Sequence, residues 1–187
     1  FLRGNDEMVM QGNDETYYFK PEYSGGSLTV GLLHVLSRNF QYGISIDMPT
    51  SLDVDELYTE SNHIDGDLSF SETYNYNVKK PLTFHAGAGV LLKFINLFYE
   101  LEFTDWQSLE FSSNEIYESD LELPASVVIN NQIRDSFSST LCHHFGTAMR
   151  LPVVPAHLFA GYQYLPVPFS GQYDDNIRES FSFGVSV

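Results

Sequence analysis

The chain has 187 residues, the length of one ordinary domain, and its 25 acidic residues against nine basic ones give a formal net charge of -16. A chain this acidic repels phosphate, so nucleic acid is not an expected partner. The single cysteine, Cys142, excludes an internal disulfide framework and any multi-cysteine zinc site. No apolar run approaches the ~20 residues that a transmembrane helix needs.

Apolar and polar side chains alternate with a period of two along most of the chain, which predicts β-strands. After a loop-rich start at 1–24, we expect three pairs of antiparallel strands joined by tight turns, at 27–49, 81–106 and 140–166. Longer stretches lie between and after them, roughly at 49–81, 105–139 and 165–180, and carry strand-like pieces of their own. A last alternating stretch, "SFSFGVSV", ends the sequence.

Short connections that alternate with long ones are typical of outer-membrane barrels, which have tight turns on one side and long loops on the other. The predicted fold class is therefore all-β, an antiparallel up-and-down transmembrane β-barrel. We expect roughly 8–10 strands in this chain, a partial barrel that forms one domain over residues 1–187.

The alternation does not by itself decide which side of the strands faces lipid. A soluble antiparallel sheet buries its apolar face, whereas a membrane barrel turns that face to lipid and wets the lumen. Charged, small and polar residues share one parity of the strands, which favours a wetted lumen. The candidate lumen-facing binding residues are His85, Phe98, Glu100, Glu102, His144 and Arg150.

Three stretches carry a resemblance to a known family. They are "YELEFTDWQSLEF" (99–111) with its Asp105-Trp106 pair, a strand ending in "MRLPVVP" (149–155), and "LFAGYQYLPVP" (158–168). Together with "NFQYGISIDMPT" (39–50), they resemble the FadL/TodX family of outer-membrane transporters for long-chain fatty acids and hydrocarbons. The resemblance covers about residues 26–187, and its motifs mark strand ends rather than chemistry.

The resemblance implies passive uptake of hydrophobic small molecules across the bacterial outer membrane, in contact with the lipid bilayer and lipopolysaccharide. The family's barrel is larger than this chain can build, and its N-terminal plug has no counterpart here. We therefore expect a C-terminal portion of such a barrel. Two alternatives stay open: an outer-membrane structural or secretion-partner barrel that contacts a surface protein, and a soluble carbohydrate-binding β-sandwich.

Residues that would carry catalysis or bind a metal form no convincing pattern, so we expect no enzyme, metal site or cofactor. His143 and His144 are adjacent and point to opposite faces of a strand. Glu100 and Glu102, roughly 7 Å apart by strand rise, fit a polar lumen better than glycoside hydrolysis. The Gly-Asn-Asp-Glu repeat at 4–7 and 12–15 and "HIDGDLS" (63–69) are interpreted as turns rather than calcium loops. A lateral opening would be sought at Gly87, Gly89 or Pro124.

Overall fold

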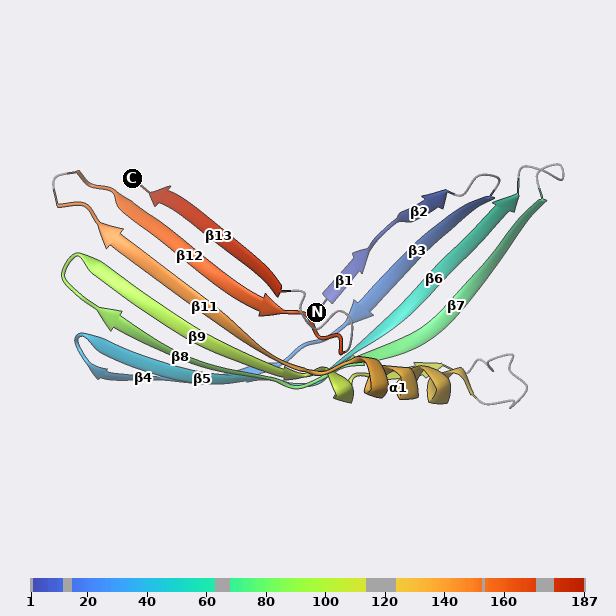
Figure 1. Ribbon diagram of the computed structural model, residues 1–187, viewed down its shortest axis with the longest axis horizontal. Helices are drawn as coiled ribbons and strands as arrows, with labels where there is room; N and C mark the ends of the chain where they lie inside the picture. The colour runs from blue at the N-terminus through green and yellow to red at the C-terminus, as the bar shows by residue number, and fades with distance from the viewer. Residues whose placement is uncertain are drawn as a thin grey trace. The chain divides into compact units, whose positions relative to one another are not determined.

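The computed structural model describes residues 2–11, 15–62, 68–113, 124–152, 154–170 and 177–186. These residues form antiparallel strands, one α-helix and one short 3-10 helix (Figure 1). The predicted all-β, antiparallel class is confirmed at this level. Neither of the two sheets closes on itself within the described residues. No helix in this part of the chain is long and apolar enough to cross a membrane.

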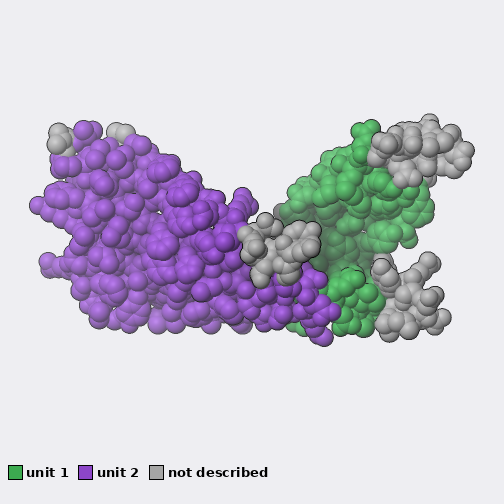
Figure 2. All heavy atoms as spheres, viewed as in Figure 1, with its two compact units in different colours: residues 1–27, 49–80, 109–132 green, residues 28–48, 81–108, 133–187 purple. Residues whose placement is uncertain are grey.

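The chain divides into two compact units, each assembled from three separated segments (Figure 2). Unit 1 comprises residues 1–27, 49–80 and 109–132, and unit 2 comprises residues 28–48, 81–108 and 133–187. Each unit contains one sheet, and they are described separately below.

Unit 1 holds a six-stranded antiparallel sheet in the order β1-β3-β6-β7-β10, with β2 also paired to β3. Its strands are β1 (Leu2–Asn5), β2 (Met8–Gln11), β3 (Glu15–Gly25), β6 (Thr50–Asn62), β7 (Leu68–Lys80) and β10 (Glu110–Ser113). The longest pairing joins β6 to β7 without a register shift. Val54, on β6, is one of the few buried apolar residues among those that the structure describes.

Unit 2 holds a seven-stranded antiparallel sheet in the order β13-β12-β11-β9-β8-β5-β4. Its strands are β4 (Thr29–Ser37), β5 (Phe40–Asp47), β8 (Thr83–Leu91), β9 (Ile95–Asp105), β11 (Ser139–Arg150), β12 (His157–Pro166) and β13 (Ile177–Ser186). The three predicted strand pairs are present as β4–β5, β8–β9 and β11–β12. A register shift between Val35 and Ser37 marks the end of the β4–β5 pair.

The structure differs from the sequence-based expectation in the number of strands. The described residues form thirteen strands rather than 8–10. The additional strands lie in the segments that the sequence analysis gives as a loop-rich start or as longer stretches between the pairs, which contain β1, β2, β3, β6, β7 and β10.

The expectation of a loop-rich start at 1–24 is wrong, because β1, β2 and most of β3 lie there. The Gly-Asn and Asn-Asp pairs of this segment are typical of turns and led to the loop prediction. Tyr17, Phe19, Pro21 and Tyr23 nevertheless follow the period-two alternation of a strand. Pro21 is tolerated in β3 because it lies between the residues that pair with β2 and those that pair with β1, where its missing amide interrupts no ladder on that side. Its carbonyl accepts a hydrogen bond from the Asp6 amide at 3.2 Å.

The stretch at 105–139 was expected to be a long connection, and it contains the helix α1 (Ala125–Ser136) and the 3-10 helix η1 (Trp106–Ser108). Pro124 directly precedes α1, a position where the missing amide costs no helical hydrogen bond. Ala125 and Ile133 are both buried, and their spacing of eight residues places them on one side of the helix.

None of the three positions considered for a lateral opening interrupts the sheet. Gly87 and Gly89 lie in β8, which pairs with β5 and β9 without a register shift. Pro124 precedes a helix and lies in no named strand.

Candidate functional site

The seven-stranded sheet of unit 2 has two chemically different faces, because successive side chains of a strand point to opposite sides. We define the polar face as the side of the sheet that carries the His85 side chain of β8, followed onto the other strands through their register. It comprises Asp47 and Ser45 on β5, Glu100 and Glu102 on β9, Cys142 and His144 on β11, Gln163 on β12 and Ser180 on β13. The opposite side is the apolar face.

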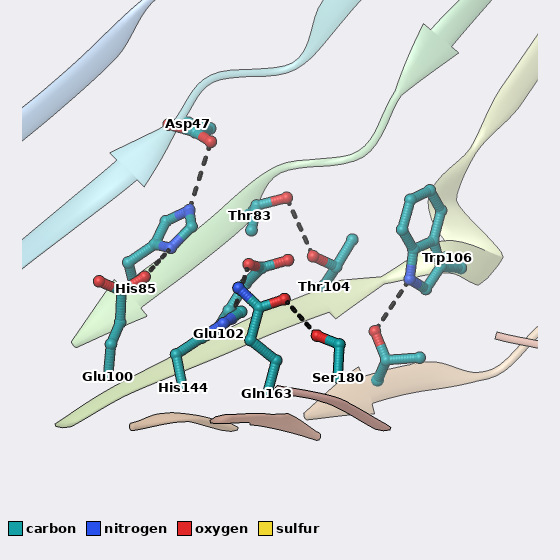
Figure 3. A network of polar contacts seen from close by, with 11 residues as sticks. Asp47, Thr83, His85, Glu100, Glu102, Thr104, Trp106, His144, Gln163 and Ser180 are labelled. Atoms are coloured by element: carbon teal, nitrogen blue, oxygen red, sulfur yellow. Dashed lines mark hydrogen bonds and ion pairs between the residues drawn. The ribbon is translucent and has the colours of Figure 1, made fainter. Parts of the chain in front are cut away.

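His85 contacts two carboxylates among the polar contacts that Figure 3 shows. Its Nδ1 is 3.2 Å from Glu100 Oε1, and its Nε2 is 3.3 Å from Asp47 Oδ2. A doubly protonated imidazole would donate to both carboxylates, and this links β5, β8 and β9 through one side chain.

A second acid–histidine contact lies on the neighbouring strands (Figure 3). His144 Nε2 is 3.4 Å from Glu102 Oε2, but without the geometry of a hydrogen bond, so the contact is an ion pair only when His144 is protonated. Around it, Thr83 and Thr104 share a hydroxyl hydrogen bond of 3.0 Å, Trp106 donates its indole N–H to Thr140, and Ser180 donates to Gln163.

A hollow of about 580 Å³ opens in this sheet, and glycines form part of its lining. Gly43 and Gly87 are directly opposite each other on β5 and β8. The hollow is bordered by polar groups at His85 and Glu100 and by an apolar ring at Phe98. The site therefore offers both charged and apolar surface to a molecule that lies against it.

All six predicted lumen-facing residues lie on the polar face. The structure brings His85 together with Glu100, and Glu102 together with His144. Phe98 lies beside Gly89 and Gly146. Arg150 is exposed at the end of β11, opposite His157 in the register, and takes no part in the histidine network.

Sequence reasoning missed Asp47, the second carboxylate at His85. Asp47 ends β5 and shares parity with Gly43 and Ser45, so the alternation that identified the other residues also pointed to it.

The apolar face is exposed over most of its width. Phe181, Phe183 and Leu32 are 67, 83 and 67% exposed, and Leu97 and Phe103 in the middle strand β9 are 46 and 44% exposed. Among its described residues this face carries two carboxylates, Asp105 at the end of β9 and Glu179 on β13. Glu179 accepts a hydrogen bond from the Tyr162 hydroxyl at 3.1 Å. Large exposed apolar surfaces of this kind mark contact with a membrane or a partner.

Aromatic rings follow one register row across the apolar face. The row runs through Phe181, Tyr162, Phe145 and Tyr99, is interrupted by Ala88, and continues with Tyr42 and His34. Neighbouring ring centroids are 5.0 Å apart for Tyr162–Phe181, 6.0 Å for Phe145–Tyr162 and 4.7 Å for Tyr99–Phe145. Cross-strand aromatic pairs at such distances stabilise a sheet while leaving an apolar surface outside.

The sheet of unit 1 differs, because polar groups appear on both of its faces. Tyr58, Tyr74 and Tyr76 share one face and donate their hydroxyls to Glu60, Glu72 and Glu56. Partial burial and the hydrogen bond to Glu56 raise the pKa of Tyr76 to about 12. The opposite face carries Asp53 hydrogen-bonded to Asn77, and Lys79 paired with Glu110 at 2.9 Å. On one face of this sheet carboxylates therefore stand among aromatic rings, with Phe19 and Tyr74 next to Tyr58, and on the other face they stand among polar side chains.

Within the described part of the chain, no group of three or more His, Cys, Asp or Glu residues is arranged to hold a metal ion. His143 lies on the apolar face, where its Nδ1 is 2.8 Å from the Tyr99 hydroxyl, whereas His144 faces Glu102 on the other side. The two histidines therefore diverge as predicted. Residues 63–67 and 12–14, which include most of the calcium-loop candidates, lie outside the described residues.

No family model, curated protein or solved structure matches this chain. The resemblance to the FadL/TodX family therefore stays a prediction from the sequence.

Proposed function

We propose that unit 2 forms part of the wall of a transmembrane β-barrel in the bacterial outer membrane. Its apolar face lies against lipid and its polar face lines a lumen through which hydrophobic small molecules pass without chemical change. The observation that carries this proposal is the exposed, nearly carboxylate-free apolar face opposite a face of paired charges.

The strand lengths support the proposal. A transmembrane β-strand needs about 9–11 residues. In unit 2, β4 and β8 have 9 residues, β12 and β13 have 10, β9 has 11 and β11 has 12, while β5 has 8. Nearly all of them are thus long enough to cross the hydrocarbon layer at the tilt that barrels have.

The distribution of charge between the units also supports it. Unit 1 holds 17 of the 25 acidic and four of the nine basic residues, which gives it a net charge of -13, against -3 for unit 2. Charge is expensive next to hydrocarbon and favourable in water. We therefore place the sheet of unit 1 in water and the sheet of unit 2 in the membrane.

A hydrophobic solute is supported by apolar side chains that interrupt the polar face. Leu33, Val35, Phe98 and Phe159 share the parity of that face and are 65, 60, 40 and 44% exposed. Exposed apolar side chains in a water-filled lumen would contact a hydrophobic solute. Long-chain fatty acids are the solute class that the FadL/TodX resemblance implies.

The soluble β-sandwich that binds carbohydrate requires Leu97, Tyr99, Leu101 and Phe103 to lie in a dry core. Leu97 and Phe103 are almost half exposed, and none of the four is buried. The sandwich is therefore disfavoured. A role as a docking or secretion partner uses the same barrel, and the acidic unit 1 would supply its contact surface.

Single-cysteine labelling of β12 tests which face meets lipid. In a Cys142→Ser background, a cysteine is placed in turn at Leu158, Ala160 and Tyr162, and at Phe159, Gly161 and Gln163. In native outer membranes, a water-soluble maleimide should modify the second set and leave the first set unmodified, because only the second set faces water. After solubilisation in denaturant, both sets should react equally.

Fractionation and heat-modifiable migration on a denaturing gel provide the independent check that the protein is a membrane barrel. Equal labelling of both sets in native membranes, or recovery of the protein in the soluble fraction, would contradict the proposal. Uptake of a radiolabelled long-chain fatty acid, compared between cells with and without the protein, then tests the solute class. Labelling as expected without uptake would retain the barrel and reject fatty acids as its solute.

A further inference from the structure

The hollow in the sheet of unit 2 is formed where glycines stand between larger side chains. On the polar face, Gly43 and Gly87 are directly opposite each other, and the same register row continues to Leu33 on β4 and Glu100 on β9. Two strands without a side chain thus separate an apolar residue from a carboxylate. The volume of about 580 Å³ lies within the range of sites that hold a small molecule.

The neighbouring register row supplies the apolar wall of the hollow. Phe98 lies opposite Gly89 on β8 and Gly146 on β11, so glycines flank it on both sides. Phe98 is 40% exposed and Leu33 is 65% exposed. Phe98 and Glu100 are two residues apart on β9, which places their Cα atoms roughly 7 Å apart on one face. A small molecule with an apolar body and one polar end can therefore contact both.

The charged groups at the hollow favour a cation over an anion. No lysine or arginine is among the described residues that line it. His85 contacts both Asp47 and Glu100, and His144 faces Glu102 (Figure 3). Three carboxylates thus stand against two imidazoles. The group stays negatively charged even when both histidines are protonated.

Hydrogen bonding gives the same preference. The two ring nitrogens of His85 lie 3.2 and 3.3 Å from carboxylate oxygens, so neither nitrogen is left for an anionic ligand. Within the described residues, the polar contacts of Glu100 reach only its Oε1, and its side chain is 49% exposed. An ionised carboxylate accepts hydrogen bonds and donates none. Glu100 can therefore accept a further hydrogen bond from a ligand that carries N–H groups.

We propose that this hollow binds a hydrophobic molecule with a cationic end, such as an ammonium group. The ammonium group lies at Glu100, and the apolar body lies over the glycines of β8 against Phe98. This inference rests on the proposed uptake of hydrophobic molecules and names their chemical class. It departs from the ionised fatty acids that the resemblance implies, because a carboxylate in this hollow would lie next to like charges.

Protection of an introduced cysteine tests the site in native outer membranes. In a Cys142→Ser background, Ser45→Cys places a thiol in the hollow, and Gln163→Cys places one on the same face outside it. Each thiol reacts with a water-soluble maleimide in the presence of 2-phenylethylamine, 2-phenylethanol or 3-phenylpropanoate, which share a phenylethyl body and differ in charge. The amine should slow modification of Ser45→Cys and leave that of Gln163→Cys unchanged. The alcohol should protect more weakly, and the carboxylate should not protect.

Two matched variants test the role of Glu100. Glu100→Gln removes its charge and keeps its size, whereas Glu102→Gln removes the same charge from the same face of β9 at a residue that does not line the hollow. Glu100→Gln should raise the amine concentration for half-protection roughly tenfold, because it removes a charge-assisted hydrogen bond. Glu102→Gln should change it by less than about twofold, since water and salt screen the more distant charge. Heat-modifiable migration verifies that both variants fold, and the comparison of the three ligands needs neither variant.

Several outcomes would overturn the proposal. Protection by 3-phenylpropanoate equal to that by the amine would show that the histidines, and not the carboxylates, set the preference. Equal protection by all three ligands would mean that only the apolar body is recognised. No protection, or equal slowing of Gln163→Cys, would reject the site, and equal effects of the two glutamine variants would reject Glu100 as the cation partner. Protection by the amine without the labelling of β12 expected for a barrel would retain the hollow and reject the proposed function.

Discussion

At the scale of single residues, Asn130 is the clearest case of a side chain that substitutes for a missing strand. It is half-buried on α1 and makes both of its hydrogen bonds to the backbone of Phe111, which is itself half-buried on β10. A short strand of four residues has little other support on its outer side. The stability of β10 should therefore depend on this one amide.

We expect Asn130→Ala to lower the local opening free energy at Phe111 by about 1–3 kcal/mol, because it leaves two backbone groups without partners. The Phe111 amide should exchange its hydrogen roughly ten- to a hundredfold faster. Asn131→Ala, at the exposed neighbouring position, is the matched control and should leave that rate unchanged. Equal acceleration by both variants would mean that helix propensity, and not the Asn130 contacts, controls the rate.

The candidate site was predictable at this scale wherever alternation alone decided the face. Phe98, Glu100 and Glu102 of β9 share one side of the sheet, as the alternation predicts, because parity within a strand survives any uncertainty about its ends. His85 and His144 lie on that same side through the register of β8 and β11 with β9. The partners of each residue were not predictable. They depend on the register between β5, β8 and β9, and no single strand contains that information.

At the scale of elements, the glycines of β8 and β11 illustrate how a strand adapts to a bulky neighbour. A Cβ at Gly89 would lie 3.1 Å from Phe98 Cδ1 and 3.2 Å from Gln41 Cγ, closer than ordinary contact. A Cβ at Gly146 would lie 3.7 Å from Phe98 Cβ, at an ordinary distance. The two glycines border the same ring but leave different amounts of room.

Gly89→Ala should therefore lower the free energy of unfolding by about 1–3 kcal/mol through overpacking. Gly146→Ala should be neutral or slightly stabilising, since a methyl group suits a strand better than hydrogen. The temperature at which heat-modifiable migration is lost, measured in detergent, compares the two variants. Equal losses would show that Phe98 moves freely and that strand propensity alone governs both positions.

The elements that the sequence failed to predict have separate physical causes. Helix α1 lies between strands in a stretch rich in Ser, Asn and Asp, and its apolar residues Val127, Val128, Ile129 and Ile133 are all β-branched, a composition typical of strands. Pro124 before the helix and the eight-residue spacing of Ala125 and Ile133 were the available signals. The division of β7 from β8 follows from Pro81, which cannot donate a ladder hydrogen bond.

At the scale of the whole molecule, charge is concentrated in unit 1, whose net charge of -13 is unfavourable for a compact sheet. Part of the acid is compensated by tyrosine hydroxyls, asparagine and lysine. Glu22 and Asp55 are an exception, since they are exposed and directly opposite each other on β3 and β6. Like charges in that arrangement destabilise a sheet.

Asp55→Asn should stabilise unit 1 by a few tenths of a kcal/mol at low ionic strength, because it removes the repulsion from Glu22. The gain should nearly vanish in 1 M salt, where the Debye length is only about 3 Å. Asp53→Asn changes the net charge by the same amount two residues away, but Asp53 lies opposite Ser24 and accepts a 2.8 Å hydrogen bond from Asn77. It should give no gain, because it weakens a charge-assisted hydrogen bond.

Urea unfolding of unit 1, followed by protease cleavage, measures both variants at each salt concentration. An equal gain from the two variants would show that the summed charge of the unit, rather than the cross-strand pair, limits its stability.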